Sequence, residues 1–305
     1  MAESATWVDL LDPNRAELED ACSGRLHARA LDQLLAPSDP DREPRPTIES
    51  HGTYVYGVFL VPVVDRDHDR VFYQEVDVVM TPDLIVSVRK TPPGDPPLDI
   101  TSARSLYEHQ GLRKPGMLVF HLVDDIAERY LDLIDAFNGE IDELEDHVEN
   151  WPAAQVRERL TGLRHDLLHI RQTLGPTRDA VRSVVDDRIH VDGHGLFDRD
   201  TSLSFGGAYD KLLRASEGLE LSRDLIAGVR DYHQAKIAED QNEVVKKLTV
   251  IASVLLVPTF IVGIYGQNFD RMPELHWHVG YAFSWILIVV TTIGQLWWYR
   301  RKGWI

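Results

Sequence analysis

The chain has 305 residues, of which 49 are acidic and 32 basic, so its formal net charge at pH 7 is -17. This charge argues against nucleic acid as a partner, because proteins that bind phosphate backbones are usually basic. It suits a protein that concentrates cations near its surface, although solubility alone is the simpler reason for it. Cys22 is the only cysteine, which excludes a disulfide within the chain and a thiolate zinc cluster and suits the cytosol. The polar N-terminus lacks an apolar signal core, so we expect the soluble part not to be exported.

Residues 1–120 are predicted to form a mixed α/β domain. Runs of β-branched, aliphatic and aromatic residues predict strands over 7–11, 53–64, 71–80 and 84–89. Helices are predicted from a cap at Asp12 or Asn14 to about residue 23, over 28–35, and over 102–110. Proline-rich loops occupy 36–46 and 91–99. We therefore expect a sheet with flanking helices, and the absence of a phosphate loop or a nucleophile motif in the sequence argues against an enzyme.

Residues 121–247 have the pattern of long helices. Apolar spacing predicts helices from 117 to about 150 and from 153 to 185, the second interrupted at Gly175-Pro176, then a turn over 186–201. A third helix is predicted to start near Ser204 and to continue without a strong breaker from 208 to 257. The acidic run over 140–149 is interpreted as a solvated face. His190 and His194 have metal-ligand spacing, but their glycine-rich turn favours a loop over a metal site.

Two uncharged apolar runs end the chain. The runs over residues 248–266 and 279–299 each have a length close to that of a helix that crosses a bilayer, which needs about 20 residues. Lys246 and Lys247 precede the first run, and the basic tail 300–305 follows the second. Basic outer flanks predict that both ends lie in the cytoplasm and that the loop 267–278 lies outside. The alternative, a buried hairpin of a soluble protein, does not explain these flanks.

One face of the first apolar run suits a pore. Its members are small, aliphatic or uncharged polar residues spaced three or four apart, about 3.5 on average, which is the spacing of a left-handed bundle seam. They are Asn242, Val245, Leu248, Ala252, Leu256, Thr259, Gly263 and Gly266. Several copies of this helix could enclose a pore, although any membrane helix offers more than one such face.

The loop between the runs resembles that of a known family. Tyr265, Gly266, Asn268, Phe269 and the sequence Met-Pro-Glu-Leu over 272–275 match the outer loop of the CorA family of divalent cation channels, with Gln267 in place of its methionine. The resemblance implies a funnel-shaped homopentamer in the inner membrane, with an α+β cytosolic domain, long helices and two C-terminal membrane helices. It also implies transport of Mg2+, with Co2+ and Ni2+ as further candidate ions, and a pore lined by Asn242, Leu248, Leu256, Thr259 and Asn268.

The chemistry of these residues fits a hydrated cation. Mg2+ dehydrates reluctantly, and amide groups and backbone carbonyls can hydrogen-bond its waters without trapping the ion. We expect Asn268 to form the selectivity ring beside Gln267 and the Gly266 carbonyl, and rings of Leu248 and Leu256 to close the pore by dewetting. Glu274 is expected to attract cations outside. The membrane potential would drive entry, so neither an ATP site nor an organic cofactor is expected.

A regulatory metal site is predicted on the cytosolic side. Asp231 matches an aspartate position that binds metal between protomers in the family, and Asp32-Gln33 takes the place of its Glu-Asp pair. Carboxylates from neighbouring copies would repel without metal and be bridged by Mg2+. The alternative is two solvated surface acids, and Gln33 departs from the full two-metal arrangement.

Two other functions remain open. A zinc transporter coupled to protons, similar to ZntB, also varies the middle residue of the motif, whereas the intact Met-Pro-Glu-Leu sequence favours magnesium. A membrane-anchored metal sensor or scaffold that conducts nothing would follow if Gln267 disables the motif.

Overall fold

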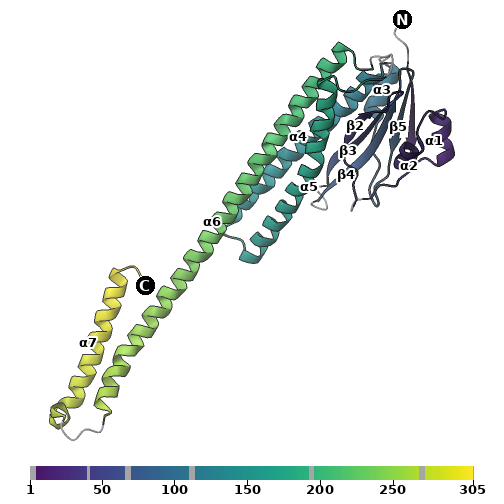
Figure 1. Ribbon diagram of the computed structural model, residues 1–305. Coiled ribbons are helices and arrows are strands. Elements are labelled where there is room, and N and C mark those ends of the chain that lie inside the picture. The colour runs from purple at the N-terminus through teal and green to yellow at the C-terminus, as the bar shows by residue number, and fades with distance from the viewer. Residues whose placement is uncertain are drawn as a thin grey trace. The chain divides into compact units, whose positions relative to one another are not determined.

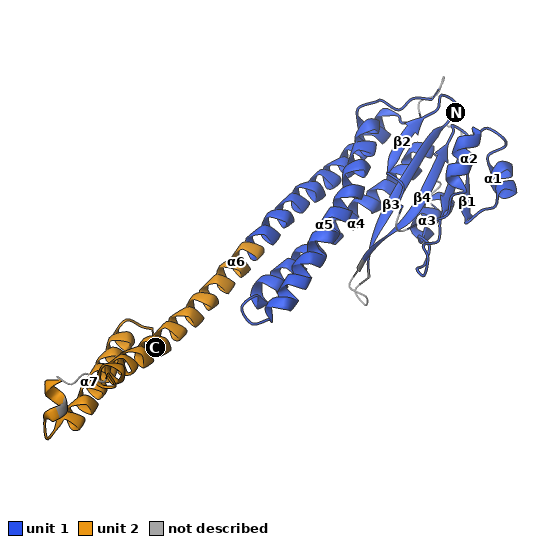
Figure 2. Cartoon of the chain, turned by 60° about the horizontal axis from the view of Figure 1, so that its bottom comes forward, with its two compact units in different colours: residues 1–229 blue, residues 230–305 orange. Residues whose placement is uncertain are grey.

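The computed structural model describes residues 5–39, 42–65, 70–109, 114–191, 196–267 and 272–304. The chain forms two compact units, unit 1 (Met1–Val229) and unit 2 (Arg230–Ile305), which are coloured separately in Figure 2. Helix α6, Arg199–Tyr265, begins in unit 1 and ends in unit 2.

Unit 1 contains a mixed five-stranded sheet in the order β1-β5-β4-β3-β2 (Figure 1). Its strands are β1 (Thr6–Leu11), β2 (Thr47–Ser50), β3 (Val55–Asp65), β4 (Arg70–Met80) and β5 (Leu84–Arg89). The parallel pair is β1 with β5, and the other three pairs are antiparallel. The four predicted strands are present. The short edge strand β2 was not predicted, because its four residues follow a proline-rich loop and show no clear alternation.

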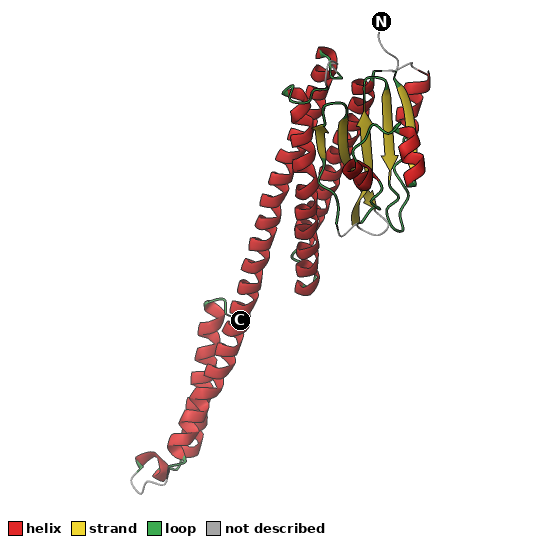
Figure 3. Ribbon diagram, turned by 45° about the vertical axis from the view of Figure 1, so that its right-hand side comes forward, coloured by secondary structure: helices red, strands yellow, loops and turns green. Residues whose placement is uncertain are grey.

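Side-chain alternation along β3 builds a core on each face of the sheet. Val55, Phe59 and Val61 are buried in one core, and Tyr56 and Val58 in the other. Helices α4 (Pro115–His147) and α5 (Ala153–Val185) contribute to the first core, and α1 (Arg15–Ala21) and α2 (Ala28–Leu34) to the second. Figure 3 shows helices on both faces of the sheet. The sheet is thus the middle layer of an α/β/α arrangement.

The first helix shows how local sequence fixes an element. Asn14 caps α1: its Oδ1 accepts from the Glu17 backbone N–H at 3.0 Å, and Glu17 Oε2 accepts from the Asn14 N–H at 3.0 Å. This reciprocal capping box fixes where α1 begins and identifies Asn14 as the cap, where the sequence leaves Asp12 or Asn14 open. Cys22 follows α1 inside the core, and burial raises the pKa of its thiol to about 11, so it is not a nucleophile at neutral pH.

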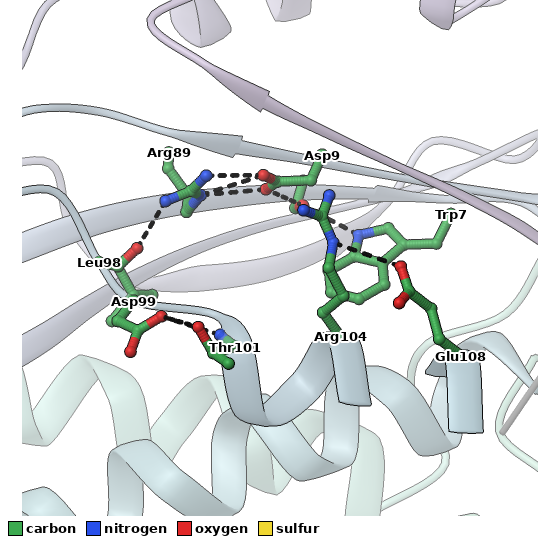
Figure 4. A network of polar contacts seen from close by, with 9 residues as sticks. Trp7, Asp9, Arg89, Leu98, Asp99, Thr101, Arg104 and Glu108 are labelled. Carbon is green, nitrogen blue, oxygen red and sulfur yellow. Dashed lines mark hydrogen bonds and ion pairs between the residues drawn. The ribbon is translucent and has the colours of Figure 1, made fainter. Parts of the chain in front are cut away.

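A buried ion pair holds the parallel strands together (Figure 4). The Arg89 guanidinium on β5 donates to both carboxylate oxygens of Asp9 on β1 over 2.7–3.2 Å, and Arg89 Nη1 donates to the Leu98 carbonyl at 2.7 Å. Ser87 Oγ donates to Asp9 Oδ1 at 2.8 Å and accepts from Trp7 Nε1 at 2.9 Å. Since Asp9 is only 4% exposed, these bonds replace the water that the carboxylate loses. The network also ties the loop that leads to α3 (Thr101–His109) to the sheet.

Helix α5 corrects one prediction. We expected Gly175-Pro176 to interrupt it, but α5 runs unbroken from Ala153 to Val185 with Pro176 inside. Proline removes one backbone donor, which usually kinks or breaks a helix. Here Ile170, Leu174 and Val181 on both sides are at most 1% exposed, so core packing holds the helix together.

Helix α6 also begins earlier than predicted, at Arg199 rather than near Ser204. The Asp198 carboxylate accepts from the Thr201 backbone N–H at 2.9 Å and so supplies the cap. His194, half of the disfavoured histidine pair, lies outside the described residues.

Candidate functional site

Unit 2 consists of the end of α6, the short 3-10 helix η1 (Pro273–His276) and α7 (Gly280–Arg301). Both α6 and α7 contain a stretch long and apolar enough to cross a membrane, and in α7 none of that stretch is buried. Leu256 is 67% exposed and Tyr281 is 80% exposed. A water-soluble unit would bury such side chains, so these helices require an apolar environment outside the chain.

One face of α6 packs on α7. Val250, Ile261 and Tyr299 are each at most 8% exposed. The hydroxyls of Ser253 and Tyr299 lie 2.7 Å apart, and Gln295 Nε2 donates to the Ser253 carbonyl at 3.4 Å. Polar contacts of this kind hold helices together in a bilayer, where apolar surface alone gives little preference for another helix over lipid.

The predicted pore face lies on the other side of α6 from this contact. All eight of its members are exposed in the single chain: Asn242, Val245, Leu248, Ala252, Leu256, Thr259, Gly263 and Gly266. Around Gly263, the described residues place no atom within 4 Å of where a Cβ would stand, apart from its own helix backbone. The face is therefore open to other copies of the chain or to the bilayer.

The C-terminal end of α6 carries the motif. The Gly266 N–H donates to the Val262 carbonyl at 2.9 Å, and the Gln267 N–H donates to the Ile264 carbonyl at 3.2 Å, which tightens the last turn. Gly266 and Gln267 are exposed. The negative end of the helix dipole lies here, which favours a cation. Asn268, predicted to form the selectivity ring, lies outside the described residues.

The turn before α7 fixes Glu274. A Cβ on Gly280 would stand 2.2 Å from the Glu274 carbonyl oxygen, so only glycine permits this close approach. The Trp277 N–H donates to the same carbonyl at 3.3 Å. Glu274 is half-buried, so the turn restricts its backbone while part of its side chain reaches solvent.

The two predicted regulatory aspartates each pair with an arginine of their own chain. Arg15 Nη2 lies 2.5 Å from Asp32 Oδ1 in unit 1, and Arg230 Nη2 lies 2.9 Å from Asp231 Oδ1 in unit 2. Within the described part of the chain, no group of three or more His, Cys, Asp and Glu side chains could hold a metal. A metal bridge between copies remains a prediction.

A buried charged trio was not predicted. Lys90 Nζ lies 2.5 Å from Glu75 Oε1 and 3.0 Å from Asp77 Oδ2, and donates to the Gln33 carbonyl at 3.1 Å. All three charged side chains are at most 5% exposed. Burial raises the pKa of Asp77 to about 7, because the single Lys90 ammonium cannot compensate two desolvated carboxylates. Burial likewise raises the pKa of Glu75. No pattern in the sequence indicates the trio, since Lys90 follows a strand as many surface lysines do.

An α/β domain joined to two apolar helices, one with an open face of small, aliphatic and uncharged polar residues, defines a membrane protein with a large extramembranous domain. Residues 2–301 match the family model for the CorA-like Mg2+ transporter protein, so the chain belongs to the CorA-like Mg2+ transporter family. The resemblance read from the loop is thereby confirmed. The family consists of membrane transporters of Mg2+ and other divalent cations, not enzymes.

Individual relatives agree with this assignment. The chain is 26% identical over 308 residues to the cobalt/magnesium transport protein CorA of Thermotoga maritima, covering all of this chain and 84% of the relative. The complete structure of the CorA magnesium transporter from Methanocaldococcus jannaschii superposes with a TM-score of 0.77 at 21% identity, over 99% of this chain and 92% of that one. This similarity confirms the predicted α+β domain, the long helices and the two C-terminal apolar helices, whereas the pentamer remains a prediction. The zinc transport protein ZntB of Yersinia enterocolitica is 25% identical over 234 residues, covering 75% of this chain and 68% of the relative.

Proposed function

We propose that the chain is a passive magnesium channel that works as a homopentamer in the inner membrane, with both termini in the cytoplasm. The observation that carries the proposal is the open face of α6: the eight residues of the predicted pore face are exposed, whereas Val250 and Ile261 of the same helix are buried and Ser253 contacts α7. Because the chain belongs to a family of Mg2+ transporters, we assign this face to the wall of a pore that forms between copies of the chain.

The proposed pathway has three parts. At the outer end, Asn268 amides, Gln267 and the Gly266 carbonyls hydrogen-bond the waters of a hydrated Mg2+, so that the ion enters without losing its shell. Rings of Leu256 and Leu248 form the apolar constriction, with Thr259 on its outer side. Two charges entering along a potential of 100 mV gain about 4.6 kcal/mol, at about 2.3 kcal/mol per charge, which is sufficient to drive uptake.

Flux into proteoliposomes tests the proposal. Mg2+ entry, read by an entrapped indicator, should follow an imposed potential and ignore a proton gradient. Asn268→Ala should abolish it, whereas Leu255→Ala should preserve it, because Leu255 is exposed on a neighbouring face of α6. Full flux in Asn268→Ala would refute the selectivity ring.

Zinc transport is the second candidate. It is favoured by Gln267, which replaces the methionine of the magnesium motif, and by the ZntB relative. Zn2+ entry that depends on a proton gradient would establish it in place of the magnesium channel. The absence of flux of either ion, from folded protein, would leave a metal sensor or scaffold.

Regulation by cytosolic Mg2+ is proposed at Asp231, with Asp32 as its partner from another copy. Asp231→Ala should weaken the inhibition of flux by internal Mg2+. Replacing the neighbouring Arg230 with Gln, which frees the Asp231 carboxylate, should strengthen it. Unchanged inhibition in both variants would exclude the site.

A further inference from the structure

A second site is built on the α2 side of the sheet in unit 1. A cavity of about 740 Å³ lies between α2, the segment 42–46, strands β2 and β3, and the side chains of Glu75 and Lys90. Its volume is that of a pocket for a small molecule. None of its lining belongs to the proposed ion pathway.

The walls of this cavity are cationic. Arg29 on α2 and Arg42 and Arg45 on the segment 42–46 all line it. Within the described part of the chain these three guanidiniums make no ion pair, although acidic residues outnumber basic ones by 49 to 32. Elsewhere in unit 1 arginines commonly meet a carboxylate, as Arg15, Arg25 and Arg89 do. Three arginines left without carboxylates around one cavity suit an anionic ligand.

The floor of the cavity offsets only part of this charge. Lys90 and Glu75 line it and pair with each other, and Lys90 also pairs with Asp77. Glu49 is the other carboxylate of the lining; its Oε1 accepts from Thr47 Oγ1 at 3.1 Å and its Oε2 lies 4.0 Å from His51 Nε2. Even with Glu49, Glu75 and Asp77 all ionised, the three arginines and Lys90 outnumber the carboxylates.

An aromatic wall adds a second kind of contact. The ring of His51 stacks on Tyr54 with centroids 5.0 Å apart and an interplanar angle of 26°. His27 Nδ1 lies 3.0 Å from the Tyr54 hydroxyl, which fixes both rings. All three side chains line the cavity, so rings and guanidiniums face one space.

We propose that this cavity binds a polyphosphate compound, with Arg29, Arg42 and Arg45 on the phosphates. Guanidiniums form two parallel hydrogen bonds to phosphate oxygens, and three of them match a ligand with several phosphate charges. The ligand is either an inorganic polyphosphate or a nucleotide, whose base would contact the exposed ring of His51, which stacks on the buried Tyr54. This site goes beyond ion transport and does not depend on the proposed channel function.

Calorimetric titration of the full chain in lipid nanodiscs tests the site. Inorganic triphosphate and ATP are titrated separately in EDTA, so that neither transport nor metal bridging contributes. We expect one site per chain with a dissociation constant below about 1 mM. Tighter binding of ATP than of triphosphate would identify a nucleotide site, and equal binding a polyphosphate site. No saturable heat with either compound up to about 10 mM would overturn the proposal.

Variants locate the site. Arg29→Gln and Arg45→Gln should each weaken binding by about tenfold, because each change removes a charge-assisted hydrogen bond to a phosphate. Arg157→Gln is the matched control, because Arg157 is exposed on α5 and lies outside the cavity. Arg42 and Arg45 also line a neighbouring cavity with His165 on α5, whereas Arg29 does not. Weakening by His165→Gln without weakening by Arg29→Gln would move the ligand to that cavity and overturn the assignment.

Discussion

The two units use the same apolar residue types in opposite ways. In unit 1, Phe59 is fully buried between the sheet and its helices, whereas in unit 2 Phe260 is 66% exposed on α6. The core of unit 1 therefore forms within one chain. The apolar side chains of unit 2 can be buried only by lipid or by other copies of the chain, so they contribute little to the stability of the single chain.

The largest expected effect tests this difference between the two units directly. Phe59→Ala removes a fully buried ring and should lower the free energy of unfolding of unit 1 by about 3–5 kcal/mol. Phe260→Ala, the same change on an exposed face of unit 2, should leave it within about 0.5 kcal/mol of the wild-type value. Urea denaturation of the full chain in detergent, followed by far-ultraviolet circular dichroism, measures both. Equal losses in the two variants would contradict the division of roles.

Removing the buried cation comes next. Lys90→Met leaves Glu75 and Asp77 without their partner and should cost about 3 kcal/mol, because protonation of the carboxylates limits the penalty of burying charge. Arg15→Gln removes an exposed pair with Asp32 and should cost less than about 1 kcal/mol. The same denaturation assay applies, and a Lys90→Met protein as stable as the wild type would show that water reaches the trio.

The smallest effect is a dependence on pH that belongs to unit 1. The folded chain holds the Asp77 proton up to a pKa of about 7, whereas the unfolded chain releases it near 3.8. This contribution to stability is complete below about pH 4 and is lost as the pH rises through 7. Between pH 5 and pH 8 the loss is about 2.8 kcal/mol at most, from the two units below a pKa of about 7 at about 1.4 kcal/mol per unit. Asp77→Asn should flatten the difference between denaturation midpoints at pH 5 and pH 8. An unchanged difference would show that Asp77 titrates normally.

The sequence predicted what depends on local pattern. Alternation along β3, the capping residue Asn14 and the apolar runs that became α6 and α7 all act over a few neighbouring residues. The pore face of α6, read from a spacing of three and four, remains a prediction: its members are exposed, but so are Leu255 and Phe260 on neighbouring faces.

What the sequence did not predict depends on contacts between distant segments. Helix α5 continues through Pro176 because the residues around it pack in the core. Lys90 is buried because Glu75 and Asp77 on the neighbouring strand β4 supply carboxylates to pair with it. The arginines of the cavity come from a helix and a loop that carry no shared motif. Such features follow from tertiary packing, which single-sequence patterns do not encode.

The parallel pairing of β1 with β5 also has a kinetic consequence. Thr6 pairs with Leu84, so joining these strands closes a loop of 78 residues, at an entropic cost of about 4 kcal/mol in a flexible chain. The antiparallel pair β3 and β4, by contrast, has its nearest partners, Asp65 and Arg70, only five residues apart. The β3–β4 hairpin is therefore expected to form early in folding, and β1 to join the sheet late, once β5 is in place to receive it.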